Sequence, residues 1–278
     1  KSPSPDLSGL SSWHVVVLAS ACTFAIATLY YIQPILPLIG ATYGVGDAAM
    51  SQTVMLGQAG YSLGLFLFVP IGDRMDRRRL ILLLLLVNTV AVAACAAAPG
   101  FAVFAAATFV AGLTTVTPQI IIPTVAGMAA PEKRGRTVGI LLSGMSAGLL
   151  LGRLLSGAVG EWAGWRAVFV LAIGLNALLV AIVWRMLPRT VPTSDLSYPK
   201  LLRSLWQLFL DHPTLRAACA TGFLAFGAFS VLWATLAALL AKPPHELGAH
   251  VAGLFGLIGV VSIVGGPILR SEEHTSEL

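Results

Sequence analysis

A short polar segment between two long apolar runs carries two acidic and four basic side chains. Its members are Gly72, Asp73, Arg74, Met75, Asp76, Arg77, Arg78 and Arg79. Carboxylates and guanidinium groups this close in the chain form ion pairs and cap neighbouring helix ends. We therefore predict a latch that holds the ends of adjacent helices in one arrangement. The simpler interpretation is that the arginines only mark a cytoplasmic loop.

Arg153 is the charged residue that lies well inside an apolar run. A charge within a bilayer is costly enough to imply a role. We expect Arg153 to bind an anionic group of a substrate or to pair with a carboxylate elsewhere in the protein. The alternative is a side chain that extends to the outer headgroups, because the residue lies near the end of its run.

Small residues recur every four positions on the same run, at Gly144, Gly148, Gly152 and Ser156, with Gly157 next to the last. This spacing places them along one face of a helix. A face of small residues lets another helix approach closely. The pattern therefore predicts a tight helix–helix seam.

Uncharged polar residues stand beside prolines in two other runs. They are Tyr30, Tyr31 and Gln33, which precede Pro34, and Gln119, which lies between Pro118 and Pro123. Prolines remove backbone N–H groups and loosen the helices that contain them. We take the four polar residues as candidates for a solute cavity. The alternative for each is a hydrogen bond between helices or an anchor at the membrane interface.

Catalytic and metal-ligating patterns are missing from the sequence. Cys22, Cys95 and Cys219 lie far apart, each within an apolar run, and no Asp or Glu falls in the middle of a run. An enzyme embedded in a membrane would need a constellation of such groups. We therefore expect no enzyme, no cofactor and no metal.

The composition excludes a soluble protein and a nucleic-acid-binding protein. Hydrophobic residues make up 57% of the 278 positions and charged residues 10%, whereas soluble domains carry about 25% charged residues. The net charge of +5 resides in short loops beside apolar runs and forms no basic domain. Lipid must therefore be the main solvent of this chain, and we expect no nucleic-acid partner.

Eight apolar runs are long enough to cross the hydrocarbon, which takes about 20 residues each. They are Val15–Leu36, Met50–Ile71, Leu80–Ala98, Phe101–Met128, Thr137–Val159, Ala167–Leu187, Leu215–Leu240 and Val251–Leu269. We therefore predict an all-α integral membrane protein.

Basic residues fall almost entirely on one side of these spans. That side holds Lys1, Arg74, Arg77, Arg78, Arg79, Lys133, Arg134, Arg136, Arg185, Arg189, Lys200, Arg203 and Arg216, and the other holds Arg166 and Lys242. Because basic loops stay in the cytoplasm, we predict a cytoplasmic N-terminus. Tryptophans near span ends are expected at the membrane interface, namely Trp13, Trp162, Trp165 and Trp184.

Three parts and a tail follow from the order of the runs. Residues 1–187 form a bundle of six helices, and residues 215–269 the first two helices of another. Between them, residues 188–214 contain leucines at helical spacing, which predicts an amphipathic helix on the cytoplasmic face. The polar residues 270–278 resemble a translation of sequencing-adapter DNA, and we exclude them as non-native.

The charged segment resembles the loop signature of the major facilitator superfamily, G-x-x-x-D-[RK]-x-G-[RK]-[RK]. Four residues match and two glycines are replaced, by Val69 and Asp76; the matches are Asp73, Arg74, Arg77 and Arg78. In that family the loop stabilises the closed cytoplasmic gate.

The stripe of small residues is similar to the antiporter motif of the same family, G-x-x-x-G-P-x-x-G-G. Arg153 occupies the proline position and Ser156 replaces one glycine. Exporters of the family often carry an arginine four residues before the position of Gly112, and here Thr108 stands in its place. Because that arginine is linked to proton coupling, the coupling route is an open question.

The resemblance implies a helical bundle of twelve spans, of which this chain carries about eight. Two six-helix bundles would alternate around a central site near the bilayer midplane. The implied protein is a monomer in the inner (plasma) membrane, similar to the drug- and sugar-efflux branches of the family and cut short at its C-terminal end, that exports a small molecule with protons as the coupling ion. The alternative is proton-coupled uptake of a small organic anion, with Arg153 as its counter-ion.

Overall fold

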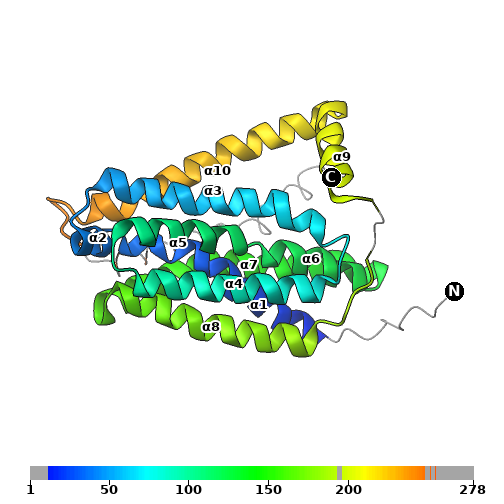
Figure 1. The fold of residues 1–278 in the computed structure, drawn as a ribbon, viewed down its shortest axis with the longest axis horizontal. Helices are drawn as coiled ribbons and strands as arrows, with labels where there is room; N and C mark the ends of the chain where they lie inside the picture. The colour runs from blue at the N-terminus through cyan, green and yellow to red at the C-terminus, as the bar shows by residue number, and fades with distance from the viewer. Residues whose placement is uncertain (1–11, 193–195, 248–250, 252–253, 255–278) are drawn as a thin grey trace, which may run out of the picture.

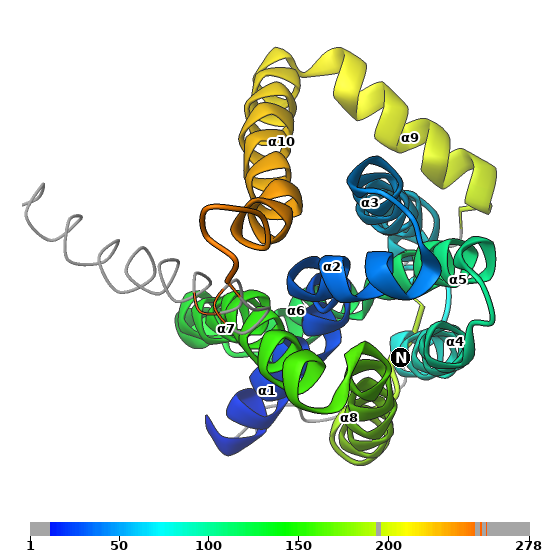
Figure 2. The same cartoon turned by 90° about the vertical axis from the view of Figure 1, so that its left-hand side faces the viewer.

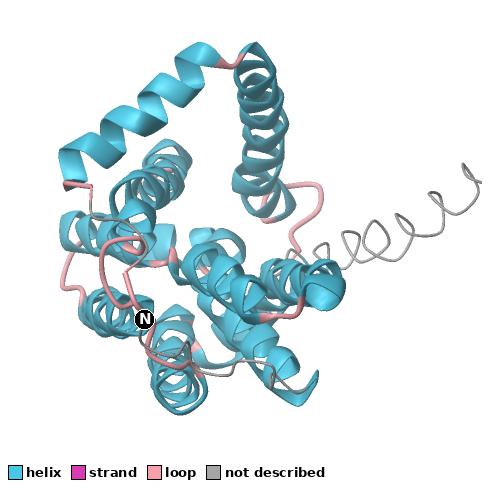
Figure 3. Cartoon of the chain, turned by 90° about the vertical axis from the view of Figure 1, so that its right-hand side faces the viewer, coloured by secondary structure: helices cyan, strands magenta, loops and turns pink. Residues whose placement is uncertain are grey.

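The computed structural model describes residues 12–192, 196–247, 251 and 254. Its helices are α1 (Ser12–Tyr30), α2 (Ile32–Tyr43), α3 (Asp47–Ile71), α4 (Arg77–Ala97), α5 (Phe101–Thr114), α6 (Thr117–Met128), α7 (Pro131–Ala163), α8 (Trp165–Met186), α9 (Tyr198–Asp211) and α10 (Pro213–Leu240). The described residues contain no strand, as Figure 3 also shows. The fold is therefore all-α, as predicted.

Seven helical stretches of the described residues are long and apolar enough to cross a membrane, counting α1 with α2 and α5 with α6 as one stretch each. They overlap the first seven predicted spans, although α1 with α2 extends beyond the predicted Val15–Leu36 at both ends, as α7 does beyond Thr137–Val159. The eighth predicted span, Val251–Leu269, lies almost wholly outside the described residues. The segment 270–278 and Lys1 lie outside them as well.

The long helices run side by side along the longest dimension of the molecule (Figure 1). Helix α9 crosses one end of this arrangement and leads to α10, which stands beside α2 and α3 (Figures 1 and 2). Arg77, Arg78 and Arg79 begin α4 at the end that α9 crosses, and we call it the basic end. No residue of α9 is buried, which agrees with a helix that lies on a surface.

Two of the membrane-crossing stretches are broken beside their prolines. The first is divided at Tyr31, and the fourth at Thr115 and Val116. Pro34 has no N–H to donate to the carbonyl of Tyr30, and Pro118 has none for the carbonyl of Thr114. The expected loosening of these helices is therefore visible as a local interruption of each.

Helix α7 packs on α1 through its small residues. A Cβ atom at Gly144 would overlap the carbonyl of Ala19, and one at Gly148 would overlap the carbonyl of Thr23. The hydroxyl of Thr23 donates a hydrogen bond of 2.7 Å to the carbonyl of Gly144. The two backbones thus touch directly, and α1 is the partner helix of the seam.

A buried polar cluster joins α4, α5 and α8. The amide nitrogen of Asn88 donates to the carbonyl of Ala111 and to the hydroxyl of Thr114, each at 2.9 Å. The amide nitrogen of Asn176 donates to the Asn88 oxygen, also at 2.9 Å. The N–H of Thr115 bonds to Gly112 rather than to Ala111. Asn88 and the hydroxyl of Thr115, which donates to the same Ala111 carbonyl at 2.7 Å, therefore replace the bond that the interrupted helix does not make.

Substitution of Gly148 by Ala should destabilise the protein, because the added methyl group would press α1 away from α7. Overpacking of this kind costs about 1–3 kcal/mol. Gly139→Ala is the matched control, since Gly139 lies on the same helix with nothing within 4 Å of the new atom. Thermal unfolding in detergent, followed by helical circular dichroism, should show a lower midpoint for Gly148→Ala alone. Equal midpoints for the two variants would contradict the seam.

Candidate functional site

The Arg153 side chain is buried, with a relative exposure of 1%. Its Nε donates to the Gln33 side-chain oxygen at 3.0 Å, and its Nη1 donates to the carbonyl of Leu149 at 2.8 Å. This burial does not fit the alternative interpretation, in which the Arg153 side chain extends to the outer headgroups. The hydrogen bonds turn the guanidinium inward, toward the interruption between α1 and α2.

Two aromatic rings contact the Arg153 guanidinium. Its central carbon lies 4.5 Å from the ring centroid of Tyr30 and 5.3 Å from that of Phe229. Cation–π contacts of this kind gain strength when they are shielded from water. Phe229 belongs to α10, so the cation of α7 meets side chains from two other stretches of the chain, α1 with α2 and α10. We call Arg153, Gln33, Tyr30 and Phe229 the arginine cluster.

The predicted cavity residues Tyr31, Gln33 and Gln119 lie at different distances from the Arg153 guanidinium. Tyr31 and Gln33 are buried, and the Tyr31 hydroxyl and the Gln33 amide nitrogen make no hydrogen bond within the described residues. Gln119 is more distant, because its amide nitrogen lies 3.5 Å from the sulfur of Met145. Met145 precedes Arg153 by about two turns of α7, or about 12 Å. Gln119 therefore belongs to the same side of α7 but not to the cluster.

The small-residue motif surrounds Arg153 on its own helix. Ser156 is buried and its hydroxyl donates to the carbonyl of Arg153 at 3.1 Å. A Cβ atom at Gly152 would lie 3.0 Å from the carbonyl oxygen of Ala27 on α1. Gly157 is buried. The close approach of α1 thus places Tyr30 under the guanidinium.

A cavity of about 490 Å³ lies between α3 and α10. Its lining is mainly apolar, with hydroxyl and amide groups from Ser51, Gln58, Ser62, Ser230 and Thr235. Ligand pockets are commonly about 300–1,000 Å³, apolar and equipped with a few polar groups. None of these residues follows from a motif, because the cavity exists only where two distant helices meet.

The charged segment ties the start of α4 to its own loop. Arg77 forms an ion pair of 2.8 Å with Asp73 and donates to the carbonyl of Gly72 at 3.1 Å. Arg74 is exposed. Asp76 caps α4 by accepting a bond of 3.1 Å from the backbone N–H of Arg78.

Asp76 also binds the segment that follows α8. Its oxygen accepts a hydrogen bond from the backbone N–H of Thr190 at 2.9 Å. The hydroxyl of Thr190 accepts from the backbone N–H of Arg77 at 2.8 Å, and Arg78 donates to the carbonyl of Trp184. Nothing in the sequence indicates the role of Thr190, since a loop threonine carries no signal of a distant partner.

Charges and aromatic rings also meet at the opposite end. Lys242, which follows α10, pairs with Asp47 at the start of α3. Trp165 is buried among aromatic rings that include Phe104 and Phe169, and its indole N–H donates to Thr42 at 2.9 Å. The Trp165 ring at the start of α8 therefore packs against other helices of the protein.

These features define a class of protein: a multi-pass helical membrane protein with a buried cation between its helices. Residues 16–272 match the sequence profile of the Major Facilitator Superfamily, and the chain belongs to this family. Among the described residues, no group of three His, Cys, Asp or Glu side chains could hold a metal ion.

Curated relatives with similar sequences are themselves named as transporters. The uncharacterized transporter YgaY of Escherichia coli O157:H7 is 37% identical over 88% of this chain and 62% of its own length. A probable transporter of Streptomyces coelicolor is 36% identical over 94% of this chain and 61% of its own. The inner membrane transport protein YnfM of Escherichia coli K12 is 28% identical over 87% and 58%. The chain therefore spans about three fifths of these relatives.

A solved structure shares the fold. The bacterial homologue of the human lysosomal transporter Spinster, in an inward-facing and unoccupied conformation, superposes with a TM-score of 0.75 and 19% sequence identity. The match covers 99% of this chain and 65% of the other. It supports the arrangement of the helices.

Asp76→Ala should destabilise the basic end, because the backbone N–H groups of Arg78 and Thr190 would lose their acceptor. Loss of a capping side chain costs about 1–2 kcal/mol. Arg74→Gln is the control, since Arg74 is an exposed charge of the same loop. Thermal unfolding should separate the two variants, and an Asp76→Ala midpoint no lower than that of Arg74→Gln would refute the role of Asp76.

Proposed function

We propose that this chain belongs to a secondary transporter that exports a small solute by alternating access, with protons as the coupling ion. Family membership supports transport, as do the names of its relatives. The similarity of the small-residue stripe to the antiporter motif supports export. The name of the relative YnfM supports the inner membrane as its location. We also propose that the protein acts as a monomer.

The observation that carries this proposal is the position of Arg153. The buried guanidinium contacts Gln33 and Tyr30 of the first stretch and also Phe229 of α10. A ligand changes a conformational equilibrium only if it binds the two states with different affinities. A solute that replaced the contact with Phe229 would alter the attachment of α10 to α1 and α7. We therefore assign Arg153 to the coupling of solute binding to helix movement.

The distribution of charge supports a cytoplasmic basic end. Apart from the buried Arg153, the described basic side chains gather there, whereas Arg166 and Lys242 lie at the opposite end. Basic loops of membrane proteins stay in the cytoplasm. The N-terminus would then be cytoplasmic, and the latch of Asp73, Asp76, Arg77 and Arg78 would close the cytoplasmic side.

The second candidate is proton-coupled uptake of a small organic anion. A buried guanidinium favours it, because an arginine binds a carboxylate with two parallel hydrogen bonds. Both candidates place the solute at the arginine cluster, and they differ in direction and in the charge of the solute.

Flux through proteoliposomes tests the transport proposal. The full-length protein is reconstituted with a pH gradient of either sign, and the flux of a panel of cationic, neutral and anionic solutes is measured. Export predicts solute movement against the direction of proton flow. Movement of an anion together with protons would select the uptake candidate instead. The absence of gradient-dependent flux for the whole panel would count against both.

Arg153→Gln should abolish flux while leaving the fold intact. The shorter neutral side chain loses the cation–π contacts but requires no buried charge, so the thermal midpoint should fall little. Arg136→Gln is the control, because Arg136 is exposed at the basic end. We expect at least a hundredfold loss of flux in the first variant and none in the second. Normal flux with Arg153→Gln would remove Arg153 from the mechanism.

A further inference from the structure

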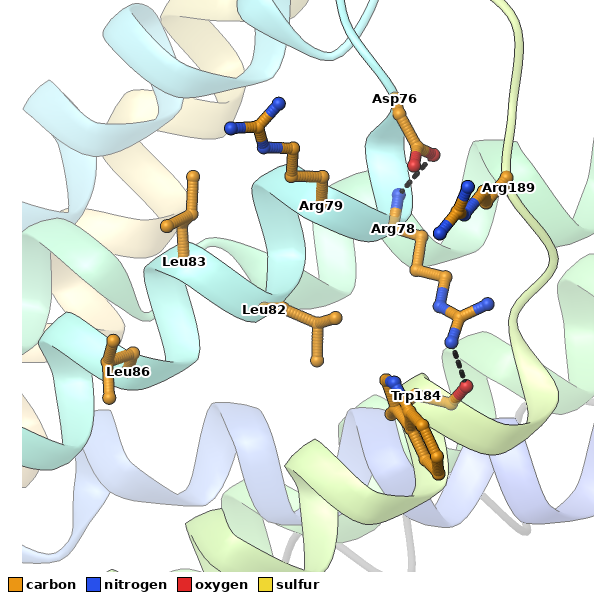
Figure 4. A pocket seen from close by; sticks show the side chains of 8 residues that line it. All are labelled: Asp76, Arg78, Arg79, Leu82, Leu83, Leu86, Trp184 and Arg189. Atoms are coloured by element: carbon orange, nitrogen blue, oxygen red, sulfur yellow. Dashed lines mark hydrogen bonds between the residues drawn. The ribbon is translucent and has the colours of Figure 1, made fainter.

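A cavity of about 600 Å³ opens at the basic end between α4 and the end of α8 (Figure 4). It lies apart from the arginine cluster. It is lined by Asp76, Arg78, Arg79, Leu82, Leu83, Leu86, Trp184 and Arg189. Three guanidinium groups and a single carboxylate thus border the same hollow, which gives it a positive charge.

Asp76 is the acidic side chain among the lining residues, and it offsets only part of the charge of the three arginines. The ion pairs of the described residues join Arg77 to Asp73 and Lys242 to Asp47, and neither includes an arginine of the cavity. The Asp76 oxygen Oδ1 accepts from backbone N–H groups of Arg78 and Thr190. Arg79 and Arg189 are exposed. Their guanidinium groups are therefore available to an anion from outside.

The remaining lining is apolar and faces away from the protein. Leu83 and Leu86 of α4 have relative exposures of 47% and 61%, and Trp184 has 61%. Arg79 lies on the same side of α4 as Leu83 and Leu86, because positions four and seven apart share a helix face. Along α4, the guanidinium of Arg79 comes first, and Leu83 and Leu86 follow toward the centre of the span.

The order of these side chains matches the order of groups in a phospholipid. Helix α4 is long and apolar enough to cross a membrane, so its first turn lies at headgroup level and its exposed leucines lie in the hydrocarbon. Trp184 occupies the level at which indole rings favour the interface. Basic pockets between transmembrane helices are suited to anionic lipid headgroups.

We propose that this cavity binds the headgroup of an anionic phospholipid. The phosphate lies among Arg78, Arg79 and Arg189, and an acyl chain follows Leu83 and Leu86. A lipid presents a phosphate to the arginines and an acyl chain to the leucines in one molecule, whereas a soluble phosphate meets only the arginines, which is why we assign the site to a lipid.

Native mass spectrometry tests the proposal on the full-length protein in detergent. Phosphatidylglycerol or phosphatidylcholine with the same acyl chains is added, and the bound lipid is counted. The variant Arg79→Gln/Arg189→Gln removes two exposed cavity charges. Lys133→Gln/Arg136→Gln is the matched control, because it removes two exposed charges of the same end outside the cavity. Circular dichroism verifies that both variants remain helical.

We expect the protein to prefer phosphatidylglycerol and the cavity variant to bind it roughly 25-fold more weakly, since each of the two basic groups removed contributes about fivefold near an anionic lipid. The control variant should retain the preference. An equal loss in both variants would indicate general attraction to the basic end and would overturn the site. Displacement of phosphatidylglycerol by millimolar glycerol phosphate would assign the arginines to a soluble phosphate and would overturn the lipid.

Discussion

The hydrogen bonding of the backbone is the constraint on which the rest of this structure depends. In hydrocarbon, each N–H and carbonyl group needs a partner within the protein. Continuous helices meet this need, and the described membrane-crossing stretches are helical for most of their length. The prolines at 34 and 118 interrupt two of them. At each interruption, buried polar side chains lie close by, with Gln33 and Arg153 at one and Asn88 at the other.

Close helix packing then fixes where the buried cation lies. Because Gly144, Gly148 and Gly152 bring the backbones of α7 and α1 into contact, the residue that follows Gly152 is directed at Tyr30. A larger side chain at any of these three glycines would widen the gap between α7 and α1. The contact between the Tyr30 ring and the Arg153 guanidinium would then weaken. The small-residue motif and Arg153 therefore act together. The small residues set the distance between α7 and α1 that the contact of Arg153 with Tyr30 requires.

The sequence predicted the first seven spans and the fold class, because both follow from local hydrophobicity and length. It also singled out residues that the structure brings together, namely Arg153, Gln33 and Tyr30. It did not indicate Phe229, Thr190 or the burial of Trp165, and the reason is physical. An apolar side chain has the same signature whether lipid or another helix surrounds it, and a loop hydroxyl reveals its partner only when the chain is folded. Contacts between distant segments are thus the part of the site that local pattern cannot supply.

The latch and the lipid cavity at the basic end share two residues, and this links them physically. Asp76 caps α4 and binds the segment after α8, while Arg78 donates its side chain to the carbonyl of Trp184 at the end of α8. Both residues also line the cavity. An anion that drew Arg78 from Trp184 would loosen the attachment of α8 to α4 at the place where the latch is built. By linkage, a lipid that binds the two arrangements of the latch with unequal affinity must shift the balance between them. The composition of the membrane would then act on the same equilibrium that a solute acts on at Arg153.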